Sequence, residues 1–264
     1  MIRALGSSRE RPAGSRYGQG EMPLPGFVDV HSHVVPSGDD GAASIEEGLA
    51  LCRIAVERGT RVLFATPHAH AGWDSYPRTP ERERIYAAAF PIMRAAVAEW
   101  GLDLRSGWEV FPTVVADYGA SELRLGGTDA VLVEFPGSWL HIPDPVPMMV
   151  AACEDIEAAG MVPVLAHPER CTAVRDDPRI VRCLAERGWL LCLNAPSLLG
   201  EHGALSEGAA WRLLDDGVVS LAASDSHGLA RPPTLDRAFR AVEKRCGRPF
   251  ALPLFDGSSL PWVG

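Results

Sequence analysis

Two histidines separated by one residue follow the first apolar run of the chain. His31 and His33 stand in the stretch FVDVHSHVVPSGDD, residues 27–40, which ends in the adjacent carboxylates Asp39 and Asp40. Imidazole and carboxylate groups are ligands for divalent ions such as Zn, Mn and Fe(II). A single HxH pair is a weak indication of a metal site, so the rest of the chain must show whether these side chains have partners.

Polar side chains, most of them able to bind a metal ion, recur after the later apolar runs. They are His68 and His70, Glu109, Glu134, His167 with Glu169 and Arg170, Asn194, and finally Asp225, His227 and Arg231. So many nitrogen and oxygen ligands exceed the needs of one ion, whereas two or three ions that share a bridging carboxylate would use them all. The sequence therefore predicts a multinuclear metal site. We expect His70 at its rim or in its outer shell, and His141 and His202 on surface loops.

The elements that would bring these side chains together alternate along the chain. Seven short apolar runs, mostly without period-two alternation, are expected to be strands buried on both faces, at 26–30, 61–66, 103–110, 130–135, 162–167, 189–194 and 218–224. Longer amphipathic stretches predict helices at 44–59, 80–101, 145–160, 178–188, 206–217 and 234–246. Such alternation gives a doubly wound α/β sheet or a barrel, and seven units favour a barrel whose active site lies at the carboxyl ends of the strands.

The composition is that of a globular protein with ample material for a core. The chain has 264 residues, of which 47% are hydrophobic and 22% charged, and its formal net charge is −9. This acidity gives no general attraction to nucleic acid or to an anionic membrane, and no stretch is apolar enough to insert into a bilayer. The six cysteines form no CxxC pair and are expected to be buried and reduced, so we expect a cytoplasmic protein.

Three segments are expected along the chain. Residues 1–25 are rich in Gly, Ser, Arg and Pro and lack the apolar core of a signal peptide, which predicts a disordered leader. Residues 26–250 carry the alternating pattern and would form the folded domain. Residues 251–264 would form a C-terminal tail.

The motifs at the strand ends resemble those of the polymerase and histidinol phosphatase (PHP) superfamily. In chain order they read DVHSH, DDG, ATPH, GWEV, VEFP, AHPER and ASDSHGLARPP. This order is most similar to that of the bacterial manganese-dependent protein-tyrosine phosphatases that accompany capsule and exopolysaccharide tyrosine autokinases. The resemblance implies that residues 26–250 form a PHP phosphatase domain, a distorted (β/α)7 TIM-like barrel with a trinuclear metal site at the C-terminal face of the strands.

The resemblance also implies a role for each matching residue. The nine matching ligands are His31, His33, Glu109 and Asp225 for the first ion, Asp40, His68 and His227 for the second, and Glu134 and His167 for the third. Glu109 would also bridge the first and third ions. The three ions would be manganese, with iron or zinc as alternatives. Arg170 and Arg231 match the two arginines that the family places on the substrate phosphate.

The implied reaction is hydrolysis of a phosphomonoester, with phosphotyrosine of a bacterial tyrosine autokinase as the expected substrate. A metal-bridging hydroxide would attack phosphorus in line, so no phosphoenzyme would form. The guanidinium groups of Arg170 and Arg231 would neutralise charge on the equatorial oxygens. Asp40, His68 and His227 could assist departure of the phenolate through metal-bound water. The pattern is compatible with a monomer or an oligomer.

Other interpretations compete with this one. A histidinol phosphatase or another small-molecule PHP phosphoesterase would use the same site with a different rim. An amidohydrolase-type enzyme also opens with HxH but often bridges its metals with a carboxylated lysine, and the only lysine of this chain, Lys244, falls in the last expected helix. A non-catalytic scaffold that binds a kinase would lack ligands or arginines, and none is missing. A cysteine phosphatase is disfavoured, because the single cysteine with an arginine six residues later, Cys52 with Arg58, falls in the expected helix 44–59.

Overall fold

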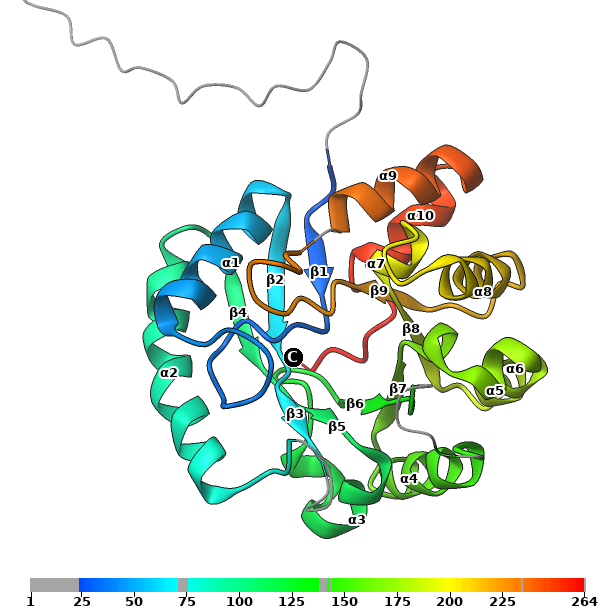
Figure 1. Ribbon diagram of the computed structural model, residues 1–264, viewed down its shortest axis with the longest axis horizontal. Coiled ribbons are helices and arrows are strands. Elements are labelled where there is room, and N and C mark those ends of the chain that lie inside the picture. The colour runs from blue at the N-terminus through cyan, green and yellow to red at the C-terminus, as the bar shows by residue number, and fades with distance from the viewer. Residues whose placement is uncertain (1–23, 71–75, 138–141, 143, 234, 264) are drawn as a thin grey trace, which may run out of the picture.

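The computed structural model of the protein describes residues 24–70, 76–137, 142, 144–233 and 235–263. Short strands surround a common centre, and helices cover them on the outside (Figure 1). Most of the expected leader lies outside the described residues, and so does His141. None of the helices in the described part of the chain combines the length and the apolar character that crossing a membrane requires.

The strands follow one another in space in the order in which they occur in the chain. They are β1 (Phe27–Asp29), β2 (Thr60–Ala65), β3 (His68–Ala69), β4 (Asp103–Ser106), β5 (Glu109–Val110), β6 (Ala130–Glu134), β7 (Val162–Ala166), β8 (Leu190–Asn194) and β9 (Leu221–Ala223). One sheet has the order β1-β2-β4 and the other β3-β5-β6-β7-β8-β9, with parallel pairing throughout. Parallel neighbours in chain order are the pattern of a (β/α) barrel.

One of the expected strands, at 103–110, is divided in two, so the prediction of an unbroken strand there is wrong. It breaks at Gly107, between β4 and β5, and a short strand that was not expected, β3, follows β2 after Pro67. Pro67 has no N–H to donate to a neighbouring strand. At Gly107 a Cβ atom would lie 2.7 Å from Leu125 Cδ2, so the backbone approaches its neighbour closely there. These breaks separate the two sheets and distort the barrel.

Backbone hydrogen bonds connect the first strand position to the last. The Asp225 N–H donates to the His31 carbonyl (2.9 Å), and Ser32 forms a parallel bridge with Ser226. On the other side the Thr66 N–H donates to the Ser32 carbonyl (2.8 Å). The segment after β1 is therefore bonded to both of its neighbours, and the seven strand positions surround one axis, as the sequence predicted.

Helices cover the outer faces of the strands (Figure 1). They are α1 (Ile45–Glu57), α2 (Pro80–Ala98), α3 (Val115–Tyr118), α4 (Val146–Ala158), α5 (Thr172–Asp176), α6 (Arg179–Glu186), α7 (Ala195–Leu198), α8 (Ala204–Asp215), α9 (Leu235–Cys246) and α10 (Arg248–Phe255). The six expected helices are present as α1, α2, α4, α6, α8 and α9, whereas α3, α5, α7 and α10 were not expected. Ser44 caps α1 as an acceptor for the Glu47 N–H (3.3 Å).

Two apolar layers explain why the strands read as nearly continuous apolar runs. The inner layer fills the ring with Val28, Val30, Phe64, Leu125, Ala130, Leu132, Val164, Ala166, Cys192, Leu221, Ala223 and Leu260. The outer layer lies between strands and helices and takes the alternate positions, such as Phe27 of β1 and Val131 and Val133 of β6. Both faces of most strands are thus buried, and in these strands the residues at the carboxyl ends are left for polar functions.

The segment expected to be a C-terminal tail belongs to this core. α10 runs across residue 250, and Phe255 is fully buried. Leu260 lies in the inner layer, and the Asp129 N–H donates to the Pro261 carbonyl (2.9 Å) just before β6 begins. This segment therefore covers the amino-terminal end of the ring, and the boundary expected at residue 250 does not hold.

Gly48 of α1 is a position where the packing leaves no room for a side chain. A Cβ atom there would overlap the Val34 carbonyl and lie 2.6 Å from Met93 Cε. We expect Gly48→Ala to lower the free energy of unfolding by roughly 1–3 kcal/mol, although alanine is the better helix former. Gly208 of α8 is the matched control, because its Cβ would meet nothing within 4 Å. Urea unfolding should show Gly208→Ala stabilised by up to about 1 kcal/mol, and equal effects of both variants would contradict the packing.

Candidate metal centre

The ligand-competent side chains meet at the carboxyl ends of the strands. Four overlapping groups are formed by His31, His33 and Asp225, by His31, Glu109 and His167, by His33, Asp40, His68 and His227, and by His68, His70 and Glu134. Within each group the potential ligand atoms lie within 4.8 Å of one another. Each of the nine expected metal ligands belongs to at least one group, and His31, His33 and His68 each belong to two.

Glu109, the first residue of β5, lies where these groups overlap. Its Oε2 is 3.2 Å from His31 Nε2, 3.3 Å from His33 Nε2 and 2.9 Å from His68 Nδ1. Its Oε1 is 2.9 Å from His167 Nε2. Burial by itself would raise the pKa of Glu109, but the facing histidines, His31 first, hold it well below its usual range. The ionised carboxylate therefore faces different imidazoles with its two oxygens, as a bridging ligand would.

The groups fit divalent cations better than a network of hydrogen bonds. Among the described residues, Glu109 Oε2 and Glu134 Oε2 are buried and accept no hydrogen bond, although imidazole nitrogens lie within 3.3 Å of each. Buried polar atoms are nearly always hydrogen-bonded. Lone pairs that converge without such bonds indicate a place for cations, and the nitrogen and carboxylate donor set suits manganese, iron or zinc.

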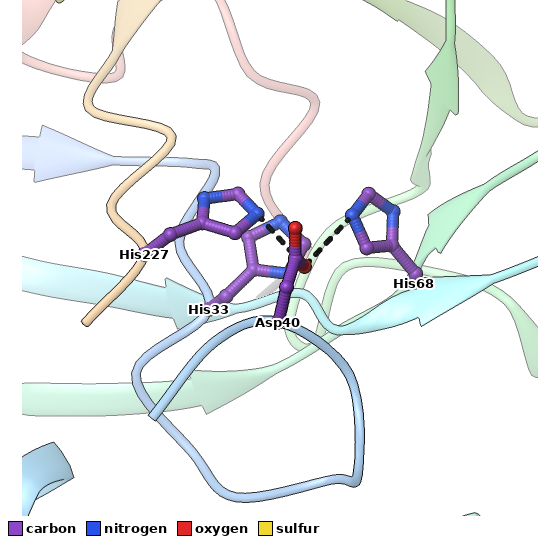
Figure 2. Close-up of side chains that lie close together, drawn as sticks. All are labelled: His33, Asp40, His68 and His227. Atoms are coloured by element: carbon purple, nitrogen blue, oxygen red, sulfur yellow. Dashed lines mark ion pairs between the residues drawn. The ribbon is translucent and has the colours of Figure 1, made fainter. Parts of the chain in front are cut away.

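Asp40 lies between His68 and His227 (Figure 2), and it forms the accessible side of the centre. Its Oδ1 lies 3.4 Å from His68 Nε2 and 3.3 Å from His227 Nε2, so the carboxylate stands between the two rings. Behind it, His33 stacks on His227 with ring centroids 3.8 Å apart. The Asp40 side chain is 44% exposed, whereas Glu109 is 1% exposed. A molecule from solvent therefore reaches the centre past Asp40.

Asp225 divides its two oxygens between the histidines and the arginines. Its Oδ1 lies 3.3 Å from His227 Nδ1. Its Oδ2 accepts hydrogen bonds from Asn194 Nδ2 (2.7 Å), Arg170 Nη1 (3.1 Å) and Arg231 Nη2 (3.1 Å). The two arginines expected to bind phosphate thus meet on one expected metal ligand. Asn194, which had no assigned role in the sequence, positions the same carboxylate from the end of β8.

Strained backbone turns two of the expected ligands toward the centre. His167 follows β7 with φ at 39°, and Asp225 comes shortly after β9 with φ at 48°. No other non-glycine residue in the described part of the chain has a positive φ. This left-handed conformation costs roughly 1–3 kcal/mol and persists only where the surroundings enforce it, which is common at functional sites. The strain marks both residues as parts of the site.

Asp39 is a site residue to which the sequence pattern assigned no role. Its Oδ2 lies 3.0 Å from His33 Nδ1 and accepts from the His68 N–H (3.1 Å), while its Oδ1 accepts from the Gly41 N–H (3.1 Å). A carboxylate on the far ring nitrogen of a histidine is the usual outer-shell partner at a metal site, because it sets the tautomer and the ring orientation. Asp39 therefore directs His33 Nε2 toward Glu109. The Asp-Asp pair was the only signal of this role in the sequence.

Arg82 of α2 holds the loop that carries Asp39. Its guanidinium is buried and donates from Nε to the Ser37 carbonyl (3.1 Å). Its Nη1 donates to the carbonyls of Tyr76 (2.6 Å) and Pro77 (2.9 Å). The loop after β1 is thus joined to the segment before α2. Nothing in the sequence around Arg82 indicated this function.

Removal of Asp39 should weaken metal binding without unfolding the protein. We expect Asp39→Ala to lower the affinity for Mn²⁺ by roughly 10–100-fold, the range found for outer-shell partners of metal ligands. Competition titration of the metal-stripped protein would measure the change, with circular dichroism as a check on the fold. Asp117→Ala, at an exposed position of α3, is the matched control and should bind Mn²⁺ as the parent does. Unchanged affinity in Asp39→Ala would exclude the orienting role.

The structure revises the places of two further histidines. His70 is buried, and its Nε2 lies 2.8 Å from Glu134 Oε2, so it belongs inside the centre and not at its rim. His202 lies in the turn before α8, as expected of a loop histidine, but it is half-buried, and its Nδ1 lies 3.0 Å from Ser197 Oγ. Both residues lack the motif spacing of the other ligands, which is why only the packing shows their places.

Comparison with known proteins identifies the family. Residues 27–258 match the family model described as capsular polysaccharide synthesis, CpsB/CapC. The chain belongs to the CpsB/CapC family. The tyrosine-protein phosphatase YwqE of Bacillus subtilis is 29% identical over 239 residues, covering 89% of this chain and 91% of that protein. The tyrosine-protein phosphatase CpsB of Streptococcus pneumoniae is 30% identical over 240 residues, covering 87% and 95%.

Solved structures agree with the assignment of this protein to the CpsB/CapC family. A chain from the crystal structures of YwqE and CpsB, described as unique metal-dependent tyrosine phosphatases, matches with a TM-score of 0.70 and 27% identity, covering 85% of this chain and 90% of that chain. The phosphotriesterase homology protein of Escherichia coli matches with a TM-score of 0.53 at 10% identity, which shows a shared fold alone. The resemblance to capsule-type tyrosine phosphatases that the motifs indicated is therefore confirmed.

Proposed function

We propose that this CpsB/CapC family protein is a metal-dependent protein-tyrosine phosphatase. The observation that carries the proposal is the convergence of Arg170 and Arg231 on Asp225, at the edge of a cluster of metal-ligand groups. A phosphate monoester dianion needs cations on several of its oxygens, and metals beside two guanidinium groups supply them. Relatives named tyrosine-protein phosphatases over most of the chain support the same activity.

The metal content is part of the proposal. Three divalent ions, manganese in the first place, would be held by His31, His33, Glu109 and Asp225, by Asp40, His68 and His227, and by Glu134 and His167. When bound, such ions polarise the phosphoryl group and lower the pKa of a water molecule. Glu109 would serve two ions, because its Oε2 faces His31 of the first proposed set and its Oε1 faces His167 of the third. His70 would add a nitrogen ligand or orient Glu134.

The residues around the ions would bind and orient the ester. Arg170 and Arg231 would hold the equatorial phosphate oxygens, and their bonds to Asp225 keep both guanidinium groups beside the centre. Asp40 and His227 stand on the accessible side, where the phenolate would leave. Burial raises the pKa of Asp40, but His227 and His68 more than offset this and hold it far below its usual range, so Asp40 stays ionised, as a metal ligand must be.

The natural substrate would be phosphotyrosine on a protein, in particular on a bacterial tyrosine autokinase. The family description links CpsB/CapC proteins to capsular polysaccharide synthesis, and the pneumococcal relative carries the name of a tyrosine-protein phosphatase. The accessible Asp40 side of the centre supports a peptide-borne substrate, because a buried site would exclude a protein segment.

The deciding experiment compares three esters on the metal-stripped protein after reloading with Mn²⁺. We expect manganese-dependent hydrolysis with a preference for a phosphotyrosine peptide over a phosphoserine peptide and histidinol phosphate. Preference for histidinol phosphate would keep the site but assign the protein to small-molecule hydrolysis. Turnover of none of the esters with metal bound would overturn the proposal in favour of an amidohydrolase-type enzyme or a scaffold. Lys244 already argues against a lysine-bridged amidohydrolase, because it is exposed on α9.

A further inference from the structure

We infer that a hollow beside Arg231 receives the aromatic ring of the substrate and so selects aryl over alkyl phosphates. The hollow has a volume of about 220 Å³ and is lined by Pro196, Glu201, His202, Ala230, Arg231 and Pro232. The inference rests on the proposed phosphatase function. It names the part of the site that distinguishes phosphotyrosine from other phosphate esters.

The hollow adjoins the proposed phosphate site because the two share Arg231. One side of this residue bonds to Asp225, with Nη2 3.1 Å from Oδ2, and the same residue lines the hollow. Its backbone is held in place, since the His227 N–H donates to the Arg231 carbonyl (3.0 Å) and the Arg231 N–H donates to the Gly228 carbonyl (3.2 Å). An ester whose phosphate lies on Arg231 therefore places its leaving group at the hollow.

The hollow suits a neutral group, in contrast to the charged centre next to it. Burial, together with the nearby charge of Arg170, lowers the pKa of His202 to about 4, so the imidazole is uncharged at neutral pH. The carboxylate of Glu201 is paired with Arg237 at 2.6 Å. Anionic oxygens are thus drawn to the arginines and to the proposed metal ions, while the uncharged ring of the ester is left to the hollow, where Glu201 is paired and His202 is neutral.

A chain of hydrogen bonds fixes the imidazole ring of His202, which forms one wall of the hollow. Glu169 Oε1 accepts from both the Asn194 N–H (3.2 Å) and the Ser197 hydroxyl (2.7 Å). Because the Ser197 proton is directed to Glu169, the Ser197 oxygen accepts from His202 Nδ1–H at 3.0 Å. The orientation of the ring and its tautomer follow from this chain. Glu169 is fully buried and adjacent to Arg170, so the same chain ties the wall of the hollow to the arginine pair.

The walls and the size of the hollow match a single aromatic ring. Pro196 and Pro232 are rigid and Ala230 is small, so these walls lose little conformational freedom when they are covered. An apolar cavity of about 150 Å³ is enough to bind benzene in another protein. The hollow here therefore accommodates a phenyl ring with its substituent, whereas the short side chain of phosphoserine would leave it unfilled.

Filling the hollow tests the inference. We expect Ala230→Phe to lower the ratio of kcat/KM for a phosphotyrosine peptide to kcat/KM for a phosphoserine peptide by roughly tenfold or more, the scale of discrimination by an apolar pocket. Phenyl phosphate against glycerol phosphate should show the same change in ratio without a peptide. The inhibition constant of inorganic phosphate reports separately on Arg231, and an unchanged value would place the effect at the ring and not at the phosphate.

Leu229→Phe is the matched control, because Leu229 is the adjacent residue, is exposed and does not line the hollow. Its aryl-to-alkyl ratio should equal that of the parent. An unchanged ratio in Ala230→Phe, or equal loss for aryl and alkyl esters, would overturn the inference while phosphatase activity stands. A parent protein without activity on phosphotyrosine would instead overturn the proposed function, so the two failures are distinguishable.

Discussion

Glu109→Gln should lose metal and phosphatase activity together. The substitution keeps the shape of the side chain but removes the charge that faces His31, His33, His68 and His167. An outer-shell partner costs roughly 10–100-fold in metal affinity, and a carboxylate that serves two ions should cost more than that. Metal analysis after equilibration with Mn²⁺, beside hydrolysis of a phosphotyrosine peptide, would measure both effects on the same sample.

Glu154→Gln is the matched control, since Glu154 forms an exposed surface pair with Arg187. This variant should keep its metal content and its rate, because surface pairs contribute little. If Glu109→Gln kept its full metal content, Glu109 would not be a bridge, even if activity fell. If it lost metal in proportion to activity, the central position of its carboxylate would be the cause of both.

Arg231→Ala should separate catalysis from metal binding. The guanidinium touches Asp225 but belongs to none of the metal-ligand groups, so we expect the metal content to stay near that of the parent. Loss of one charged donor that stabilises the transition state should lower kcat/KM by roughly 10²–10³-fold. Arg231→Lys should recover only part of this loss, because an ammonium group cannot hold two phosphate oxygens as a guanidinium does.

Arg245→Ala provides the comparison for Arg231→Ala. Arg245 is similarly exposed and also bonds a carboxylate, Asp215 at 2.6 Å, but it lies on α9 away from the strand ends. Its substitution should leave kcat/KM unchanged. Loss of metal in Arg231→Ala would show that the arginine acts by holding Asp225 in place. A kcat/KM equal to that of the parent would remove Arg231 from the phosphate site.

The barrel was predictable because its pattern is local. Strands buried on both faces read as apolar runs, and their alternation with amphipathic stretches needs no knowledge of distant contacts. The breaks at Pro67 and Gly107 were not predicted, because they arise from pairing with neighbouring strands and, at Gly107, from close packing on Leu125. The role of the last residues was missed for the same reason. In the sequence, Leu260 looks like part of a short tail. Only the assembled ring of strands shows that it belongs to the inner apolar layer.

The sequence by itself determined the fold class and the residue types at the strand ends, since parallel strands in chain order bring their carboxyl ends to one face. Only the tertiary structure decided which side chains face one another there. In the structure, His70 lies against the Glu134 carboxylate, Asp39 lies against the His33 ring, and both Arg170 and Arg231 donate to Asp225. These contacts depend on loop conformations and on strained backbone after the strands, and such geometry is set by packing between distant segments, which leaves no period or spacing in the sequence.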